Sequence, residues 1–198
     1  MFGKISRRNR ALVLLIAGLL TVIYFVPVWS IHLVAPQYPE GMGMFIWAGK
    51  ITGISQFDLN NINILNHYVG MAPIVEESIP EFQYMPYVLG FMIFGAVVAF
   101  FYYRRVMIYL GFLNLALVGL AGFYDFWRWE YNYGHHLNPE APISIPSMVY
   151  QPPLIGCKQL LNITSCSWPH VGGILLLVVG SLLAYMTYSL ARDEPDAR

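Results

Sequence analysis

Histidine and methionine side chains gather in two polar segments of the chain, residues 33–84 and 125–170. All five histidines lie in or beside these segments: His32, His67, His135, His136 and His170. Of the nine methionines, four lie there as well: Met42, Met44, Met71 and Met148. Imidazole and thioether ligands suit copper better than magnesium or calcium, whereas zinc more often combines imidazole with carboxylate or thiolate. This pattern predicts a copper site in the polar segments.

The methionines and histidines of the first segment occur at spacings that suit ligands. Met42 and Met44 have a single residue between them. His67 and Met71 are four residues apart, which puts them on one face of a helix if that helix continues past Gly70. The alternative is that these methionines fill irregular apolar gaps, as methionine often does.

In the second segment, Asp125 ends an apolar run and is followed by Glu130, His135 and His136. One interpretation makes Asp125 and one histidine ligands, with the other histidine hydrogen-bonded behind them. The alternative is a structural ion pair between Asp125 and Arg128, which are three residues apart. The predicted metal ligands are His67, Met71, His135, His136, Asp125, Met42 and Met44.

The two cysteines, Cys157 and Cys166, both lie in the second polar segment. In an oxidising compartment two such thiols form a disulfide, and this is the interpretation we favour. Free thiols, or a thiolate copper site, are the alternatives. A redox pair of the kind found in quinone-linked oxidoreductases normally includes a Cys-x-x-Cys motif, which this sequence lacks.

The segments between and around these residues are strongly apolar. The 198 residues are 57% apolar and only 11% charged, against ~25% charged in a typical soluble domain. Four uncharged runs are long enough to cross a bilayer, which needs about 20 helical residues. They cover residues 11–31, 85–103, 106–124 and 171–190.

The sequence therefore predicts an all-α membrane protein that forms one integral membrane domain over residues 1–198. It has four transmembrane helices and two extended outer loops, 33–84 and 125–170. The first loop is expected to contain a short amphipathic helix from Asp58 to Gly70, since Ile62, Leu65 and Val69 share one helical face. The six aromatic residues among 124–133 suit the headgroup layer.

Basic residues predict the orientation. Eight of the eleven lie before the first run, between the second and third, or after the fourth, so both termini are expected in the cytoplasm. The outer loops then face the periplasm, if the membrane is the inner membrane of a Gram-negative bacterium. Ser6-Arg7-Arg8 also suggests a twin-arginine export signal, but the apolar run that follows is too long for the hydrophobic region of such a signal.

Three strings of the outer loops resemble a family of poorly characterised bacterial multi-pass membrane proteins. They are residues 67–71 (HYVGM), 125–131 (DFWRWEY) and 151–156 (QPPLIG). That family is associated with loci for nitrous oxide reductase maturation. The resemblance implies copper handling at the periplasmic face of a bacterial inner membrane, and it supplies no catalytic residues.

We expect an accessory protein that binds or delivers copper, with the lipid bilayer and other membrane or periplasmic proteins as partners. Two alternatives are a non-catalytic subunit of a larger respiratory or oxygenase-type complex, and a membrane enzyme with its own outer metal centre. Nucleotide-binding and hydrolase motifs are absent. The eleven basic and eleven acidic residues balance, which argues against a nucleic-acid partner.

Overall fold

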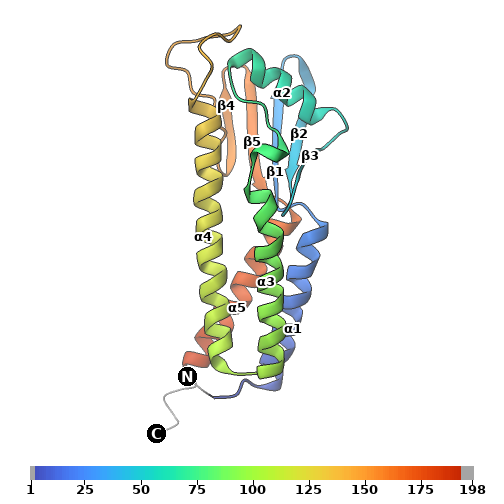
Figure 1. Ribbon diagram of the computed structural model, residues 1–198, viewed down its shortest axis with the longest axis vertical. Helices are drawn as coiled ribbons and strands as arrows, with labels where there is room; N and C mark the ends of the chain where they lie inside the picture. Colours follow the sequence, from blue (N-terminus) through green and yellow to red (C-terminus); the bar gives the residue numbers. More distant parts are fainter. Residues whose placement is uncertain (1–2, 193–198) are drawn as a thin grey trace.

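The computed structural model describes residues 3–192, which form a bundle of long helices with a β-sheet at one end (Figure 1). Four helices are long and apolar enough to cross a membrane, which confirms the four predicted spans at that level. They are α1 (Arg7–Val22, continued by the 3₁₀ turn η1, Ile23–Phe25), α3 (Glu81–Tyr102), α4 (Arg105–His135) and α5 (Val171–Arg192). The start of α1 and the end of α5 lie at the end of the bundle remote from the sheet, hereafter the terminus end.

The prediction of an all-α protein is wrong, because the polar segments form a five-stranded antiparallel sheet. The strand order is β3-β2-β1-β5-β4. The strands are β1 (Trp29–Ala35), β2 (Tyr38–Ile46), β3 (Ile51–Gly53), β4 (Gly156–Leu160) and β5 (Ile163–Pro169).

The first strand was hidden inside the first apolar run. A helix over residues 11–31 was expected, but α1 and η1 end at Phe25. Val26 is extended, with φ −134°, because Pro27 disfavours helical backbone in the residue before it. Residues 29–31 of the uncharged run therefore belong to β1, where Trp29 and Ile31 enter a core rather than the bilayer.

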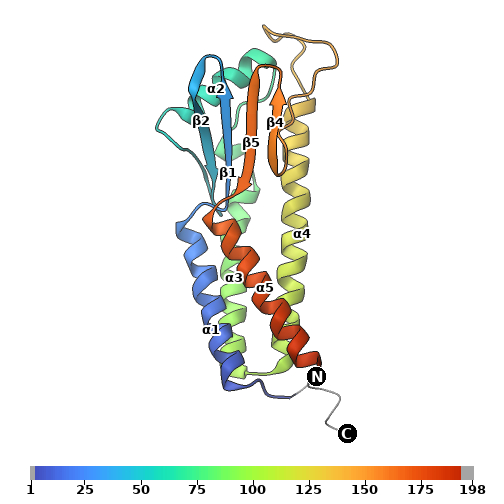
Figure 2. The ribbon, with the colours of Figure 1, turned by 180° about the vertical axis from the view of Figure 1, so that it is seen from behind.

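One face of the sheet is covered and the other is open. Helix α2 (Asp58–Val69) lies across one face, and Figure 2 shows the opposite face with no helix over it. The covered face carries a core that includes Ile31, Met42 and Met44 of the strands and Ile62 of α2. The amphipathic helix predicted after Phe57 is thus confirmed, but it packs on a sheet.

Helix α4 runs well past the predicted span. Residues 106–124 were expected to cross the membrane and residue 125 to begin a loop, yet the helix continues to His135. Its 31 residues measure about 46 Å at 1.5 Å per residue, so the last ten or so extend beyond a ~30 Å hydrocarbon core. Phe126, Trp129 and Tyr133 on this extension pack against the core of the sheet instead of all lying among headgroups.

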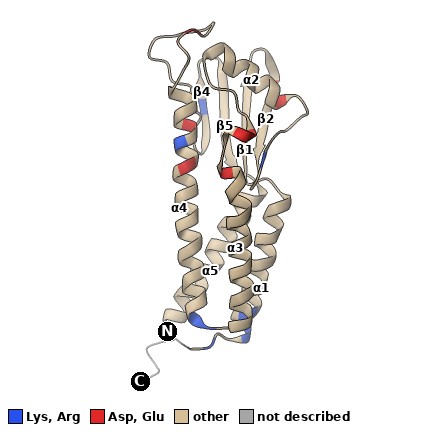
Figure 3. Ribbon diagram, viewed as in Figure 1, with Lys and Arg blue, Asp and Glu red and all other residues tan. Residues whose placement is uncertain are grey.

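The charges divide along the length of the molecule (Figure 3). Among residues 3–192, basic side chains concentrate at the terminus end, and the acidic side chains all lie at the sheet end. This division agrees with the positions of the basic residues in the sequence, most of which lie before the first apolar run, between the second and third, or after the fourth.

Candidate functional site

A small cavity of about 60 Å³ lies between the covered face of the sheet, α2 and the extension of α4. Its walls are mostly apolar, and its polar side chains are few. The lining side chains that matter for chemistry are Met44, Asn66, Met71, Trp129, Glu130, Tyr133 and Tyr150. We refer to it as the outer cavity. Its volume has room for a few water molecules or one small ion, since a single water needs roughly 10–15 Å³.

Strand β2 brings a methionine to this cavity. Met44 pairs with Ile31 of β1, and Met42 pairs with Leu33, so both methionines face the covered side. Met42 and Met44 are 4% and 3% exposed. Only Met44 lines the outer cavity, whereas Met42 packs into the surrounding core.

The end of α2 brings a second methionine. Gly70 ends the helix in the left-handed conformation, with φ +82°, which glycine adopts without steric penalty. The backbone N–H of Met71 then donates to the carbonyl of Asn66, at 2.8 Å, and Met71 lines the cavity. Because the helix does not continue past Gly70, Met71 does not share a helical face with His67.

Asp58 fastens the other end of α2 to the sheet. Its carboxylate accepts hydrogen bonds from the backbone N–H of Gly43 at 2.9 Å and of Ser55 at 3.1 Å, and from the Ser55 hydroxyl. Burial alone would raise the pKa of Asp58, but these hydrogen bonds outweigh it and hold the pKa below its usual value. Asp58 is the first residue of α2 and joins this helix to Gly43 of β2, which positions α2 over the covered face of the sheet.

Glu130 is the most unusual residue of the cavity. It lies on the extension of α4, beyond the apolar run, and is 0% exposed. Neither carboxyl oxygen has a hydrogen-bond partner among the described residues. Burial raises the pKa of Glu130 to about 8. An acid held this way keeps its proton in the absence of a cation.

Two further polar groups beside the cavity lack partners. The Tyr150 hydroxyl and the Trp129 indole N–H are buried with no hydrogen-bond partner in the described part of the chain. Burial also raises the pKa of Tyr150. Buried polar atoms are nearly always paired in native proteins, so three such groups around one cavity point to an occupant.

Gly134 explains how Tyr150 reaches the cavity. A side chain at Gly134 would meet the backbone of Gln151 at 2.4 Å, so its absence lets the loop lie directly on α4. The N–H of Tyr150 donates to the carbonyl of Gly134 at 3.0 Å. Gly134 is one helical turn after Glu130, on the same face, so the contact brings Tyr150 and Glu130 to the same side.

The other predicted ligands do not line the outer cavity. His67 is exposed on α2, and His136 is exposed at the end of α4. His135 stacks on Tyr131, with ring centroids 3.8 Å apart. Asp125 is ten residues earlier on the same helix, about 15 Å away along its axis. Within residues 3–192, no group of three or more His, Cys, Asp or Glu side chains could hold a metal ion.

The cysteines form the favoured disulfide. Cys157 and Cys166 are directly opposite each other on β4 and β5, with an S–S distance of 2.05 Å. Cys166 also pairs with His32, which lies on the open face of the sheet. The disulfide is therefore on the side of the sheet away from the outer cavity.

Met44 and Met71 were among the metal ligands predicted from the sequence, whereas Glu130 and Tyr150 were not. Glu130 is an acid within a run of aromatic residues, and Gly134 follows it at helical spacing. That pair was the available signal. Tyr150 carries no signal, because its place depends on a contact between a loop and a helix end.

The fold and the outer cavity define a class: a protein with four candidate membrane-spanning helices and a sheet that encloses a small site at one end. Comparison of the chain with family models and with curated proteins finds no match.

Proposed function

We propose that this protein binds Cu(I) in the outer cavity and serves as a copper-handling accessory protein of a membrane. One observation carries the proposal: two methionines and a buried carboxyl group that has no partner among the described residues line the same small cavity. The ligands are the thioethers of Met44 and Met71 and the carboxylate of Glu130.

The ligand types favour Cu(I) over other ions. Thioethers are soft ligands that select Cu(I), whereas magnesium, calcium and manganese prefer several oxygen ligands. Only one carboxylate lines the outer cavity, which is too few oxygen donors for a dedicated calcium site. Zinc would call for imidazole or thiolate, and no histidine or cysteine of residues 3–192 lines the cavity.

The single negative charge of an ionised Glu130 also favours a monovalent cation such as Cu(I). A carboxylate buried without a counter-ion is strongly destabilising. A monovalent cation that replaces the Glu130 proton leaves the cavity neutral. Binding then removes the penalty for ionising Glu130, and uptake of the ion releases one proton below pH 8.

The experiment is an anaerobic Cu(I) titration of the detergent-purified protein against a chromophoric Cu(I) chelator. We expect one Cu(I) per chain. Met44→Leu/Met71→Leu keeps side-chain volume nearly constant. Since loss of even an outer-shell partner weakens metal binding by roughly 10–100-fold, this variant should bind more than about 100-fold more weakly. Met42→Leu is the matched control, being equally buried on the same strand but outside the cavity.

Two results would contradict the proposal. The first is a wild-type protein with no measurable Cu(I) affinity. The second is equal weakening by Met42→Leu and by the cavity variant, which would indicate a general packing effect. A variant lacking His67, His135 and His136 should bind as the wild type does; if it alone loses binding, the metal site lies among those histidines.

The location is also part of this proposal. We infer a bacterial inner membrane with the sheet end in the periplasm and both termini in the cytoplasm. The basic side chains at the terminus end support this orientation through the positive-inside rule. The resemblance of the outer-segment strings to proteins of nitrous oxide reductase maturation loci supports delivery of copper to an enzyme.

The open face of the sheet favours a second candidate, a non-catalytic subunit of a larger membrane complex. Val34 and Trp168 are 47% and 48% exposed on the sheet strands, and exposed aromatic side chains are enriched at protein interfaces. Trp168→Ser should then release a co-purifying subunit without loss of Cu(I) binding. Co-purification that is unchanged by this substitution would count against this candidate.

A further inference from the structure

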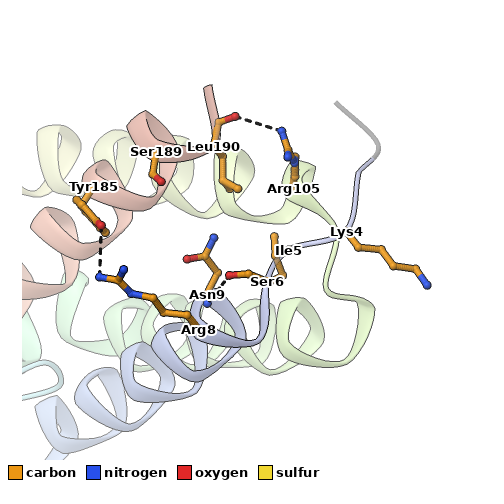
Figure 4. A pocket seen from close by; sticks show the side chains of 9 residues that line it. All are labelled: Lys4, Ile5, Ser6, Arg8, Asn9, Arg105, Tyr185, Ser189 and Leu190. Atoms are coloured by element: carbon orange, nitrogen blue, oxygen red, sulfur yellow. Dashed lines mark hydrogen bonds between the residues drawn. The ribbon is translucent and has the colours of Figure 1, made fainter. Parts of the chain in front are cut away.

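A second cavity lies at the terminus end, between the start of α1, the start of α4 and the end of α5 (Figure 4). Its volume is about 330 Å³. The lining is polar and cationic, with Lys4, Ser6, Arg8, Asn9, Arg105, Tyr185 and Ser189 among its side chains. We call it the basic cavity.

The chain builds this cavity from three separate segments. The N–H of Ile5 donates to the carbonyl of Tyr103 at 2.8 Å, and the N–H of Arg105 donates to the carbonyl of Gly3 at 3.0 Å. These bonds hold residues 3–5 against the turn between α3 and α4. The Ser6 hydroxyl accepts from the N–H of Asn9 and so begins α1 at the cavity.

Two arginines are held in place on its walls. One terminal nitrogen of Arg8 donates to the Tyr185 hydroxyl at 3.4 Å, and one of Arg105 donates to the Leu190 carbonyl at 3.2 Å (Figure 4). The Nε of Arg105 is buried and has no partner in the described part of the chain. Lys4 lines the rim, but its amine extends away from the cavity. The geometry therefore presents two guanidinium groups to the cavity, and the buried Nε–H of Arg105 is a donor without a partner among the described residues.

No carboxylate balances these charges within residues 3–192, where none of the residues around the basic cavity is acidic. The start of α1 adds the partial positive charge of a helix N-terminus. An anion with several oxygen acceptors matches this set, since guanidinium groups bind phosphate in a bidentate geometry.

The cavity lies at the depth of lipid headgroups. Arg8 precedes the apolar run that begins at residue 11, Arg105 precedes the run that begins at residue 106, and Leu190 ends the last run. Basic pockets between membrane helices at this level bind phospholipid headgroups.

We propose that the basic cavity binds the phosphate-bearing headgroup of an anionic phospholipid, with Arg8 and Arg105 as its cationic contacts. The acyl chains lie along the helices, and the headgroup joins α1, α4 and α5 at the terminus end. This site is independent of the copper proposal.

The test is native mass spectrometry of the detergent-purified full chain with added phosphatidylglycerol or phosphatidylcholine. We expect retention of one phosphatidylglycerol per chain and no comparable retention of phosphatidylcholine. Each arginine lost should weaken binding about fivefold, from roughly 1 kcal/mol per basic side chain near a membrane surface. Arg8→Gln should therefore weaken binding about fivefold and Arg8→Gln/Arg105→Gln about 25-fold. Arg7→Gln/Arg192→Gln removes two charges at the same end but outside the cavity, and should bind as the wild type.

Three outcomes would overturn the proposal. Equal loss of phosphatidylglycerol in the two double variants would mean general attraction by the basic end. Thermal stabilisation by inorganic phosphate equal to that by the lipid would mean a site for a free anion. Binding that occurs only after removal of residues 193–198, which include Asp193, Glu194 and Asp196, would make the chain's own acidic segment the occupant. Arg8 is exposed, so Arg8→Gln tests the site even if replacement of Arg105 impairs folding.

Discussion

Glu130 should make the stability of the metal-free protein fall as the pH rises. Its pKa is raised from an ordinary 4.5 to about 8 in the folded chain. Below pH 4.5 the carboxyl group is protonated in both folded and unfolded chains, and it imposes no pH dependence. Between pH 4.5 and 8 the unfolded chain ionises while the folded chain keeps its proton, so folding becomes less favourable with every unit of pH.

The size of this effect follows from the shift. At 1.36 kcal/mol per pKa unit, the loss approaches about 5 kcal/mol at pH 8 and above. For a chain of this size, 1 kcal/mol corresponds to roughly 2–4 °C in Tm, so the Tm of the wild type should fall by about 10 °C or more. Glu130→Gln keeps the shape and removes the ionisation. At pH 5 the ionisation of Glu130 costs only about 1 kcal/mol, so the Tm of this variant should lie within roughly 2–4 °C of the wild type, and it should exceed the wild type by about 10 °C at pH 8.5.

Thermal unfolding of the detergent-purified protein in a copper chelator, from pH 5 to 8.5, measures this directly. Glu140→Gln is the control, because Glu140 is an exposed acid of the same outer region and should leave the wild-type slope intact. Parallel curves for the wild type and Glu130→Gln would refute the reasoning, since the slope would then come from other groups. Saturation with Cu(I) should flatten the wild-type curve, because the ion replaces the proton.

Three other perturbations test the elements around the outer cavity. Gly134→Ala should destabilise by roughly 1–3 kcal/mol through overpacking and lower the measured Tm, whereas Gly95→Ala, with nothing within 4 Å of the added methyl, should not. Asp58→Asn should lower the Tm near neutral pH and should also make the Tm fall less steeply as the pH is lowered. The reason is that the lowered pKa of Asp58 contributes stability that is lost as the pH falls through that pKa. An equally steep fall of Tm in the variant and the wild type would contradict this. Cys157→Ser/Cys166→Ser should lower stability by about 2–3 kcal/mol without changing the Cu(I) titration, and a loss of Cu(I) binding would show that the open face contributes to the metal site.

The membrane helices were predictable because their signal is local. An uncharged run of about 20 residues is long enough for a spanning helix, and each of the four runs overlaps a helix that is long and apolar enough to cross a membrane. Pro27 also indicated the end of the first helix. The uncharged, mostly apolar residues after it, however, continued the pattern of a membrane span, so the change to a strand was not predicted.

The sheet was harder to predict because its signals are short. The turn between β4 and β5 uses Leu161 at φ 56° rather than the Asn-Gly or Asp-Gly pair that marks most tight hairpins. Ile31 and Leu33 alternate with polar residues in β1, which is the pattern of a half-buried strand, but over too few residues to outweigh the apolar run before it.

The sequence indicated which kinds of side chain line the candidate site, but not which residues come together there. Met44 and Met71 were expected as ligands on chemical grounds, and both line the outer cavity. Their association with Glu130 depends on the length of α4 and on its contact with the sheet. Neither property can be derived from the spacing of residues along the chain.

The order of strands in the sheet has a consequence for biogenesis. The central strands β1 and β5 come from opposite ends of the chain, and the Trp29 indole N–H donates to the Ser167 hydroxyl at 2.7 Å across them. During synthesis, β1 leaves the ribosome long before its partner exists, and domains fold only as their segments become available. The first three strands must therefore wait, incompletely paired, until the last helix is being inserted. The outer cavity, which is lined in part by Leu160 of β4 and Ile163 of β5, can take its final form only once these strands have been synthesised.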